Sequence, residues 1–153
     1  MNMMKNILLI ALVLFVVACG DDDGPPNFDG TNEEQIQAYI TDNNLDATRS
    51  NSGLYYVIEN PGTGAQPTAT SNVRVAYKGY FTNGNVFDES DDNGISFPLT
   101  NVIPGWTEGI QYFREGGNGI LLVPSNLGYG SRGTNGIPGG TVLIFDVALI
   151  EIN

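Results

Sequence analysis

The sequence predicts an α+β domain in which a sheet of antiparallel strands wraps around one short helix. Short apolar or alternating runs, separated by turn residues, recur from Gly53 to the end of the chain. Asn83-Gly84 lies between two of these runs, and a single helical pattern around Trp106 interrupts them. With 153 residues, of which 41% are hydrophobic and 15% charged, the chain has enough material for one packed core and no second domain.

Residues 1–18 have the pattern of a secretory signal peptide. Lys5 precedes the unbroken apolar run Ile7–Ala18, which is shorter than the roughly 20 residues of a membrane-spanning helix. A small residue, Ala18, stands directly before Cys19, the only cysteine. This ending resembles the lipobox of bacterial lipoproteins, whose cysteine is lipidated and starts the mature chain. The alternatives are a plain secretory signal with an incidental cysteine, or a buried apolar segment.

Residues 19–30 are predicted to form a flexible acidic tether. The run Asp21-Asp22-Asp23, with glycine and proline after it, cannot bury apolar surface. The aspartates resemble the acidic tract of surface-exported lipoproteins, or they are only a solvated spacer. Signal and tether together predict a lipid-anchored protein of the cell envelope, with the outer membrane favoured and its periplasmic or surface face left open. The lipid anchor would be the only contact with the membrane.

Residues 31–52 are expected to contain a short helix and a linker. Thr31 and Glu34 fit a capping box, and Ile36, Tyr39 and Ile40 follow at helical spacing. We therefore predict an amphipathic helix near 32–43, too short to be stable alone. It would pack on the domain or act as a spacer.

Residues 53–153 are predicted to form the main domain. Strands are expected over 54–58, 73–78, 80–81, 86–87, 120–123 and 141–150. Asn83-Gly84 predicts a hairpin between the third and fourth of these. The last strand is apolar on both faces, which is typical of a central position. Trp106, Ile110 and Phe113 lie at i, i+4 and i+7, which predicts a helix over Pro104–Phe113.

Charge and composition exclude several functions. The 6 basic and 17 acidic residues give a net charge of -11, so a nucleic-acid partner is not expected. The sequence contains no histidine, the commonest general base and zinc ligand, and its single cysteine rules out an internal disulfide. Ser125 and Ser131 therefore cannot belong to a serine–histidine triad. We expect neither a metal nor a cofactor.

Two loops offer weak alternatives. Asp88, Ser90 and Asp92 alternate as in a calcium-binding EF-hand loop, but Gly94 comes one place late and Leu99 occupies the twelfth position. A solvated acidic turn fits better. The glycines between residues 128 and 140 lack the lysine and the spacing of a phosphate-binding loop, so we interpret them as a flexible loop over a pocket.

Aromatic residues are dense on the predicted strands, helix start and loop: Tyr77, Phe87, Phe97, Trp106, Tyr129 and Phe145. Composition alone favours a plain aromatic core over a binding pocket. Five sequence segments, taken in their order along the chain, favour a binding pocket instead. They are Val73–Tyr80, Asn83–Ser90, Val102–Gly109, Pro124–Gly130 and Ile137–Val147. Together they resemble the FKBP family of peptidyl-prolyl isomerases over roughly residues 54–153.

The resemblance implies a twisted antiparallel sheet curled around one helix, with an apolar pocket between them. It also implies a role for each matching residue. Trp106 would form the pocket floor, Tyr77, Phe87 and Phe145 its walls, and Val102 and Ile103 its rim, with Phe97 matching a neighbouring wall residue. The Ile103 N–H and the Tyr129 hydroxyl would bind ligand carbonyls, Asp88 would lie near the twisted bond, and Ile137 would lie on the loop above.

The resemblance further implies proline-containing polypeptide clients and, as possible inhibitors, the macrolides tacrolimus and rapamycin. A non-catalytic module that only holds proline-containing segments of a partner remains the alternative. The segment 93–99 is short, and Ile95 falls where many relatives carry a second pocket aromatic, although a shifted alignment would exchange it with Phe97. A missing aromatic ring would change the depth of one pocket wall, and with it the affinity for macrolides. The acidic domain without an obvious exposed apolar stripe favours a monomer.

Overall fold

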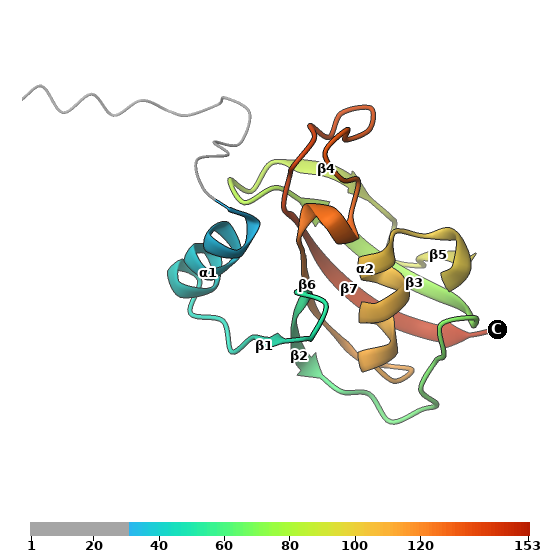
Figure 1. The fold of residues 1–153 in the computed structure, drawn as a ribbon. Helices are drawn as coiled ribbons and strands as arrows, with labels where there is room; N and C mark the ends of the chain where they lie inside the picture. The colour runs from blue at the N-terminus through green and yellow to red at the C-terminus, as the bar shows by residue number, and fades with distance from the viewer. Residues whose placement is uncertain (1–30) are drawn as a thin grey trace, which may run out of the picture.

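The computed structural model describes residues 31–153, and Figure 1 shows its fold. The predicted signal peptide, lipidated Cys19 and tether therefore lie outside the described residues. Within residues 31–153, no helix is long and apolar enough to cross a membrane.

One antiparallel sheet forms the body of the molecule, as predicted. Its strands are β1 Thr48–Arg49, β2 Tyr55–Asn60, β3 Asn72–Tyr80, β4 Val86–Glu89, β5 Ile95–Pro98, β6 Asn118–Val123 and β7 Leu143–Ile152. The order across the sheet is β1-β2-β6-β7-β3-β4, and β5 pairs with β3. The strand β7 lies between β6 and β3, which confirms the central position that its two apolar faces predict.

The outer edge of β3 is shared by two strands. Its last residues pair with β4, with Tyr80 opposite Val86, and its first residues pair with β5, with Val73 opposite Phe97. The predicted hairpin at Asn83-Gly84 is confirmed, and Gly84 has the positive φ of 87° that glycine adopts most easily. The strands β1 and β5 are not among the predicted elements.

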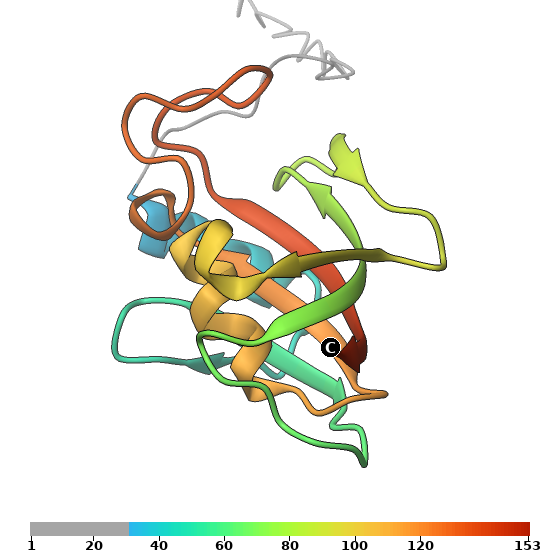
Figure 2. The same cartoon turned by 90° about the vertical axis from the view of Figure 1, so that its right-hand side faces the viewer.

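The helix enclosed by the sheet is shorter than predicted. It is α2, Pro104–Gly109, and it continues as a 3-10 turn over Ile110–Tyr112. The predicted face is nonetheless buried: Trp106 is 5% exposed, and Ile110 and Phe113 are fully buried against the inner face of the sheet. Figure 2 shows the sheet curving past this helix (yellow).

The N-terminal helix α1, Asn32–Asp42, packs on the opposite face of the sheet. Its buried Ile36 joins a separate apolar cluster with Tyr55, Val57, Leu122 and Val142. Leu121, next to Leu122 on β6, belongs instead to the main core, because neighbouring strand residues point to opposite faces. Of the two alternatives left by the sequence, packing on the domain is the one observed. The predicted capping box between Thr31 and Glu34 is also confirmed.

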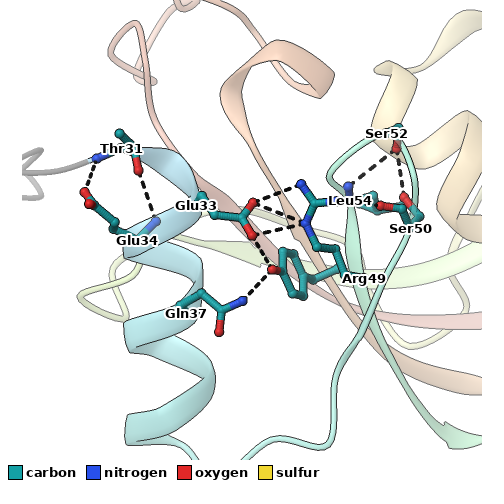
Figure 3. A network of polar contacts seen from close by, with 9 residues as sticks. Thr31, Glu33, Glu34, Gln37, Arg49, Ser50, Ser52 and Leu54 are labelled. Carbon is teal, nitrogen blue, oxygen red and sulfur yellow. Dashed lines mark hydrogen bonds and ion pairs between the residues drawn. The ribbon is translucent and has the colours of Figure 1, made fainter.

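Polar contacts fasten α1 to the first strands (Figure 3). Glu33 accepts hydrogen bonds from the Arg49 guanidinium at 3.1 Å and from the Tyr55 hydroxyl, and Gln37 donates to the same hydroxyl. The ion pair is exposed on both sides, so it contributes little to stability compared with the burial of Ile36. The contacts join the first turns of the helix to β1 and β2.

Candidate active site

A cavity of about 440 Å³ lies between the start of α2 and the inner face of the sheet. Its walls come from four strands, the helix start and one loop. The lining residues are Tyr77, Phe87, Asp88, Ile95, Phe97, Asn101, Val102, Ile103, Trp106, Tyr129 and Phe145. A concave, mostly aromatic cavity with a few polar groups at its edge is the usual form of a ligand site.

A bulge in β4 brings two adjacent residues into this cavity. Gly79 pairs with Asp88 and Tyr80 with Val86, so Phe87 is the extra residue between two pairs. In a regular strand, neighbours point to opposite faces, whereas a bulge re-aims one of them. Phe87 and Asp88 consequently both line the cavity. Gly79 is needed opposite them, because a Cβ there would lie 2.7 Å from the Phe87 ring.

Aromatic rings meet at Trp106, which forms the cavity floor. Its indole lies 5.0 Å from the ring of Tyr77, 5.4 Å from that of Phe97 and 5.2 Å from that of Phe145. Tyr77 and Phe145 meet it edge to face, which is a favoured arrangement of aromatic pairs. The buried indole Nε1 has no hydrogen-bond partner among the described residues. Apart from this N–H the floor is apolar, and its rings are closely packed.

Apart from the indole N–H of Trp106, the polar groups of the cavity lie toward its mouth. The Tyr77 hydroxyl donates a hydrogen bond of 2.7 Å to Asp88 Oδ2. In the described part of the chain, the backbone N–H of Ile103 donates to no protein acceptor, while its carbonyl accepts from Trp106 and Thr107 at the start of α2. Tyr129, which is 41% exposed, lines the same cavity from the loop after Pro124. The mouth therefore offers an amide donor and a hydroxyl beside an apolar floor.

Nine of the ten predicted pocket residues line this cavity. Ile137 does not, since it is 7% exposed and lines a neighbouring cavity that also contacts Phe87, Asp88 and Tyr129. Asn101 lines the cavity without having been predicted, and no motif in the sequence marks it. Ile95 and Phe97 both line it, because β5 pairs them with Val75 and Val73 on the same face of β3. Ile95 stays 47% exposed at the rim.

The alternative calcium loop is a hydrogen-bonded turn. Ser90 Oγ accepts from the Tyr77 N–H and donates to the Asp91 carbonyl, and Asp91 Oδ1 accepts from Asn93. Within residues 31–153, no cluster of three or more histidine, cysteine, aspartate or glutamate side chains is placed to hold a metal ion.

A larger groove of about 670 Å³ lies elsewhere, on the outer face of β3, β7 and β6. It is edged by the carboxylates of Glu59, Glu89, Asp91, Asp92 and Asp146. It lacks the enclosed aromatic floor, and we place the candidate site in the smaller cavity for that reason.

Two tyrosines predict how stability depends on alkaline pH. Burial, followed by the hydrogen bond to Asp88, raises the pKa of Tyr77 above its ordinary 10.0, and burial with hydrogen bonds to Tyr39 and Asp146 raises the pKa of Tyr80. The folded chain thus keeps both hydroxyl protons to a higher pH than the unfolded chain does. The resulting stability is complete below pH about 10 and is lost as the pH rises from there toward the folded-state values.

We expect the urea midpoint to fall in a pH series that crosses about pH 10. The matched control is the double variant Tyr77→Phe, Tyr80→Phe, whose midpoint should fall less over the same range. Equal decreases in the two proteins would contradict the assignment.

Comparison with known proteins bears directly on this geometry. Residues 64–150 match the family model described as FKBP-type peptidyl-prolyl cis-trans isomerase. The chain belongs to this family. All five segments that resemble FKBPs lie within or overlap the matched residues, which confirms the resemblance.

Individual relatives agree with the family. The chain is 45% identical over 122 residues to the FKBP-type peptidyl-prolyl cis-trans isomerase FkpA of Aeromonas hydrophila, covering 78% of this chain and 45% of that protein. The crystal structure of FkpA from Escherichia coli superposes with a TM-score of 0.73 at 35% identity, covering 78% and 58% of the two chains. A peptidyl-prolyl cis-trans isomerase of Pseudomonas syringae pv. tomato gives 0.69 at 29% identity, covering 83% and 99%. The chain spans about half the length of the curated relatives it matches.

Proposed function

We propose that this FKBP-family protein accelerates the cis–trans isomerisation of X–Pro bonds in polypeptides. The observation that carries the proposal is the cavity of Trp106, Phe87 and Phe145, a packed aromatic site with the Ile103 N–H and the Tyr129 hydroxyl at its mouth. The family match supports it.

The reaction suits such a site because it makes and breaks no covalent bond. Rotation about the peptide bond is opposed by amide resonance, with a barrier of about 18–20 kcal/mol. In the twisted transition state that resonance is lost, so the carbonyl is less polar than in the planar amide. A dry aromatic cavity binds this state better than the planar one, and such differential binding accelerates a reaction. A histidine or nucleophile is not required, and the sequence has no histidine.

The residues at the mouth take separate roles in this proposal. The free N–H of Ile103 and the hydroxyl of Tyr129 bind substrate carbonyls and orient the chain over Trp106. Asp88, held by Tyr77 at 2.7 Å, faces the changing dipole of the rotating carbonyl and does not transfer a proton. A reduction of the barrier by about 7 kcal/mol, shared among these effects, would give roughly 10⁵-fold acceleration.

A module that binds proline-containing segments without turnover is the second candidate. It would need the same apolar cavity but not the groups that act on the rotating bond. The presence of Asp88, Phe87 and Tyr129 together around one cavity favours the enzyme.

The test is cis–trans exchange of a Leu-Pro peptide, measured by NMR with catalytic amounts of the protein. The control is the double variant Tyr129→Phe, Asp88→Ala, which changes two groups at the mouth and leaves the aromatic floor in place. Catalysed exchange that collapses in the variant supports the enzyme. Peptide binding with exchange at the uncatalysed rate would establish the binding module instead.

The cellular setting is part of the same proposal. Lys5, the apolar run Ile7–Ala18 and the following Cys19 support a lipid anchor in the cell envelope, with the outer membrane favoured. The clients would be proline-containing segments of envelope or surface proteins, met by a monomer. Tacrolimus and rapamycin are candidate inhibitors, although the partly exposed Ile95 leaves one wall without an aromatic ring.

A further inference from the structure

A side chain far from the cavity in sequence holds the loop that carries Tyr129. Asn32 is the first residue of α1, on the outer side of the sheet. Its Nδ2 donates a hydrogen bond of 2.8 Å to the Gly140 carbonyl, and its Oδ1 accepts one of 2.7 Å from the Ser125 N–H. These two residues are the ends of the segment 125–140, which we call the Tyr129 loop. In Figure 2 the start of α1 (blue) lies beside this loop (orange to red-brown).

The contacts of Asn32 complete a closed ring of four hydrogen bonds. The Ser125 carbonyl accepts from the Gly130 N–H at 2.7 Å, and the Gly130 carbonyl accepts from the Gly140 N–H at 2.9 Å. Asn32 then joins Gly140 back to Ser125. The ring thus ties both ends of the loop to the residue that directly follows Tyr129. Removing Asn32 opens it, since no other described side chain bonds to the Ser125 N–H or the Gly140 carbonyl.

Tyr129 depends on such support from the backbone. Its side chain is 41% exposed, so packing alone fixes it weakly. A displacement of about 1 Å in a group that contacts the substrate can cost on the order of 100-fold in rate. Without Asn32 the ends keep their backbone bonds to Gly130 but lose their link to α1, and the glycines at 128, 130, 133, 136, 139 and 140 let the loop take other conformations.

We propose that Asn32 is a positioning residue of the active site, through which the N-terminal helix holds the Tyr129 hydroxyl at the mouth of the cavity. This inference rests on the proposed isomerase function. It gives α1 a role in catalysis although the helix lies on the other face of the sheet. Asn32 itself touches neither substrate nor the rotating bond.

The test is a double-mutant cycle on the rate of catalysed Leu-Pro exchange. Asn32→Ala should lower kcat/KM by about tenfold in the parent and by less than about twofold in a Tyr129→Phe background, because the two residues act through one hydroxyl. Asn32→Asp keeps the acceptor for Ser125 and loses the donor to Gly140, so its loss should be intermediate. Asn43→Ala makes the same change at the other end of α1, where the side chain bonds, among residues 31–153, only to the Tyr39 carbonyl, and should leave the rate unchanged.

Amide hydrogen exchange separates this inference from the proposed function. The N–H groups of Ser125, Gly130 and Gly140 should exchange faster in Asn32→Ala than in the parent or Asn43→Ala, while the urea midpoints of the two variants stay close together. If the parent is inactive but the loop amides exchange faster in Asn32→Ala, the proposed isomerase function is wrong. The role of Asn32 in holding the loop would still stand. An active parent whose rate falls equally with and without the Tyr129 hydroxyl, or does not fall, would overturn the positioning role.

Discussion

Phe87→Ala is expected to lower kcat/KM for Leu-Pro exchange by about 10- to 100-fold, because burying a phenylalanine is worth about 1.5–3 kcal/mol and each 1.36 kcal/mol is tenfold in rate. Phe87 is the extra residue of the β4 bulge. Its ring centre lies 5.6 Å from that of Phe145 and 5.0 Å from that of Phe81. Its loss opens the cavity wall to water, which restores solvation of the planar amide and removes the preference for the twisted one.

Val86→Ala is the matched control for this variant. Val86 is the neighbouring residue on β4, is 45% exposed and does not line the cavity. We expect its rate to equal that of the parent. Near-UV circular dichroism should show a folded protein in both cases, since Phe87 is only half-buried. A folded Phe87→Ala variant with the parent's rate would show that the aromatic wall is not where the reaction occurs.

Gly119→Ala is expected to have the largest effect on stability. A Cβ on Gly119 would lie 1.9 Å from the Val57 carbonyl oxygen and 2.9 Å from the Phe113 ring. The first of these atoms belongs to the paired strand β2, so relief requires a shift of the backbone. Overpacking against side chains costs about 1–3 kcal/mol, and a clash with a paired strand should cost at least the upper end of that range.

The measurement is the free energy of unfolding in urea, with Asn118→Ala as the control on the preceding residue. Asn118 points to the other face, where its side chain donates to Glu59 at 2.8 Å, and its loss should cost less than about 1 kcal/mol. If Gly119→Ala is as stable as Asn118→Ala, the close packing of β6 on β2 is wrong.

Local signals in the sequence were sufficient for the elements whose causes are local. Thr31 and Glu34 form the predicted capping box, and Asn83-Gly84 forms the predicted hairpin. The buried face of Trp106, Ile110 and Phe113 follows from their spacing, even though the α-helix ends at Gly109 and a 3-10 turn replaces its last turn. Composition alone did not distinguish a binding pocket from a plain aromatic core, and the resemblance to a family was needed to predict the pocket.

Features that depend on distant residues could not be predicted. The strand β5 has no alternating apolar run long enough to stand out, and it forms because the first half of β3 leaves an edge free for it. The bulge that points both Phe87 and Asp88 toward the cavity arises from the way β4 pairs with β3. The sequence of β4 alone does not reveal this pairing. Asn32 reaches partners 93 and 108 residues away, so a local pattern cannot mark it.

The most direct test of the account is an NMR titration of the ¹⁵N-labelled protein with a Leu-Pro peptide, following the indole N–H of Trp106. The chain has a single tryptophan, so one indole signal reports on the cavity floor. We predict that this signal shifts and saturates with the peptide, while the amides of Lys78 and Ala148 at the outer groove stay in place. An unmoved indole signal together with saturating shifts at Lys78 and Ala148 would contradict the aromatic cavity as the site of binding and catalysis.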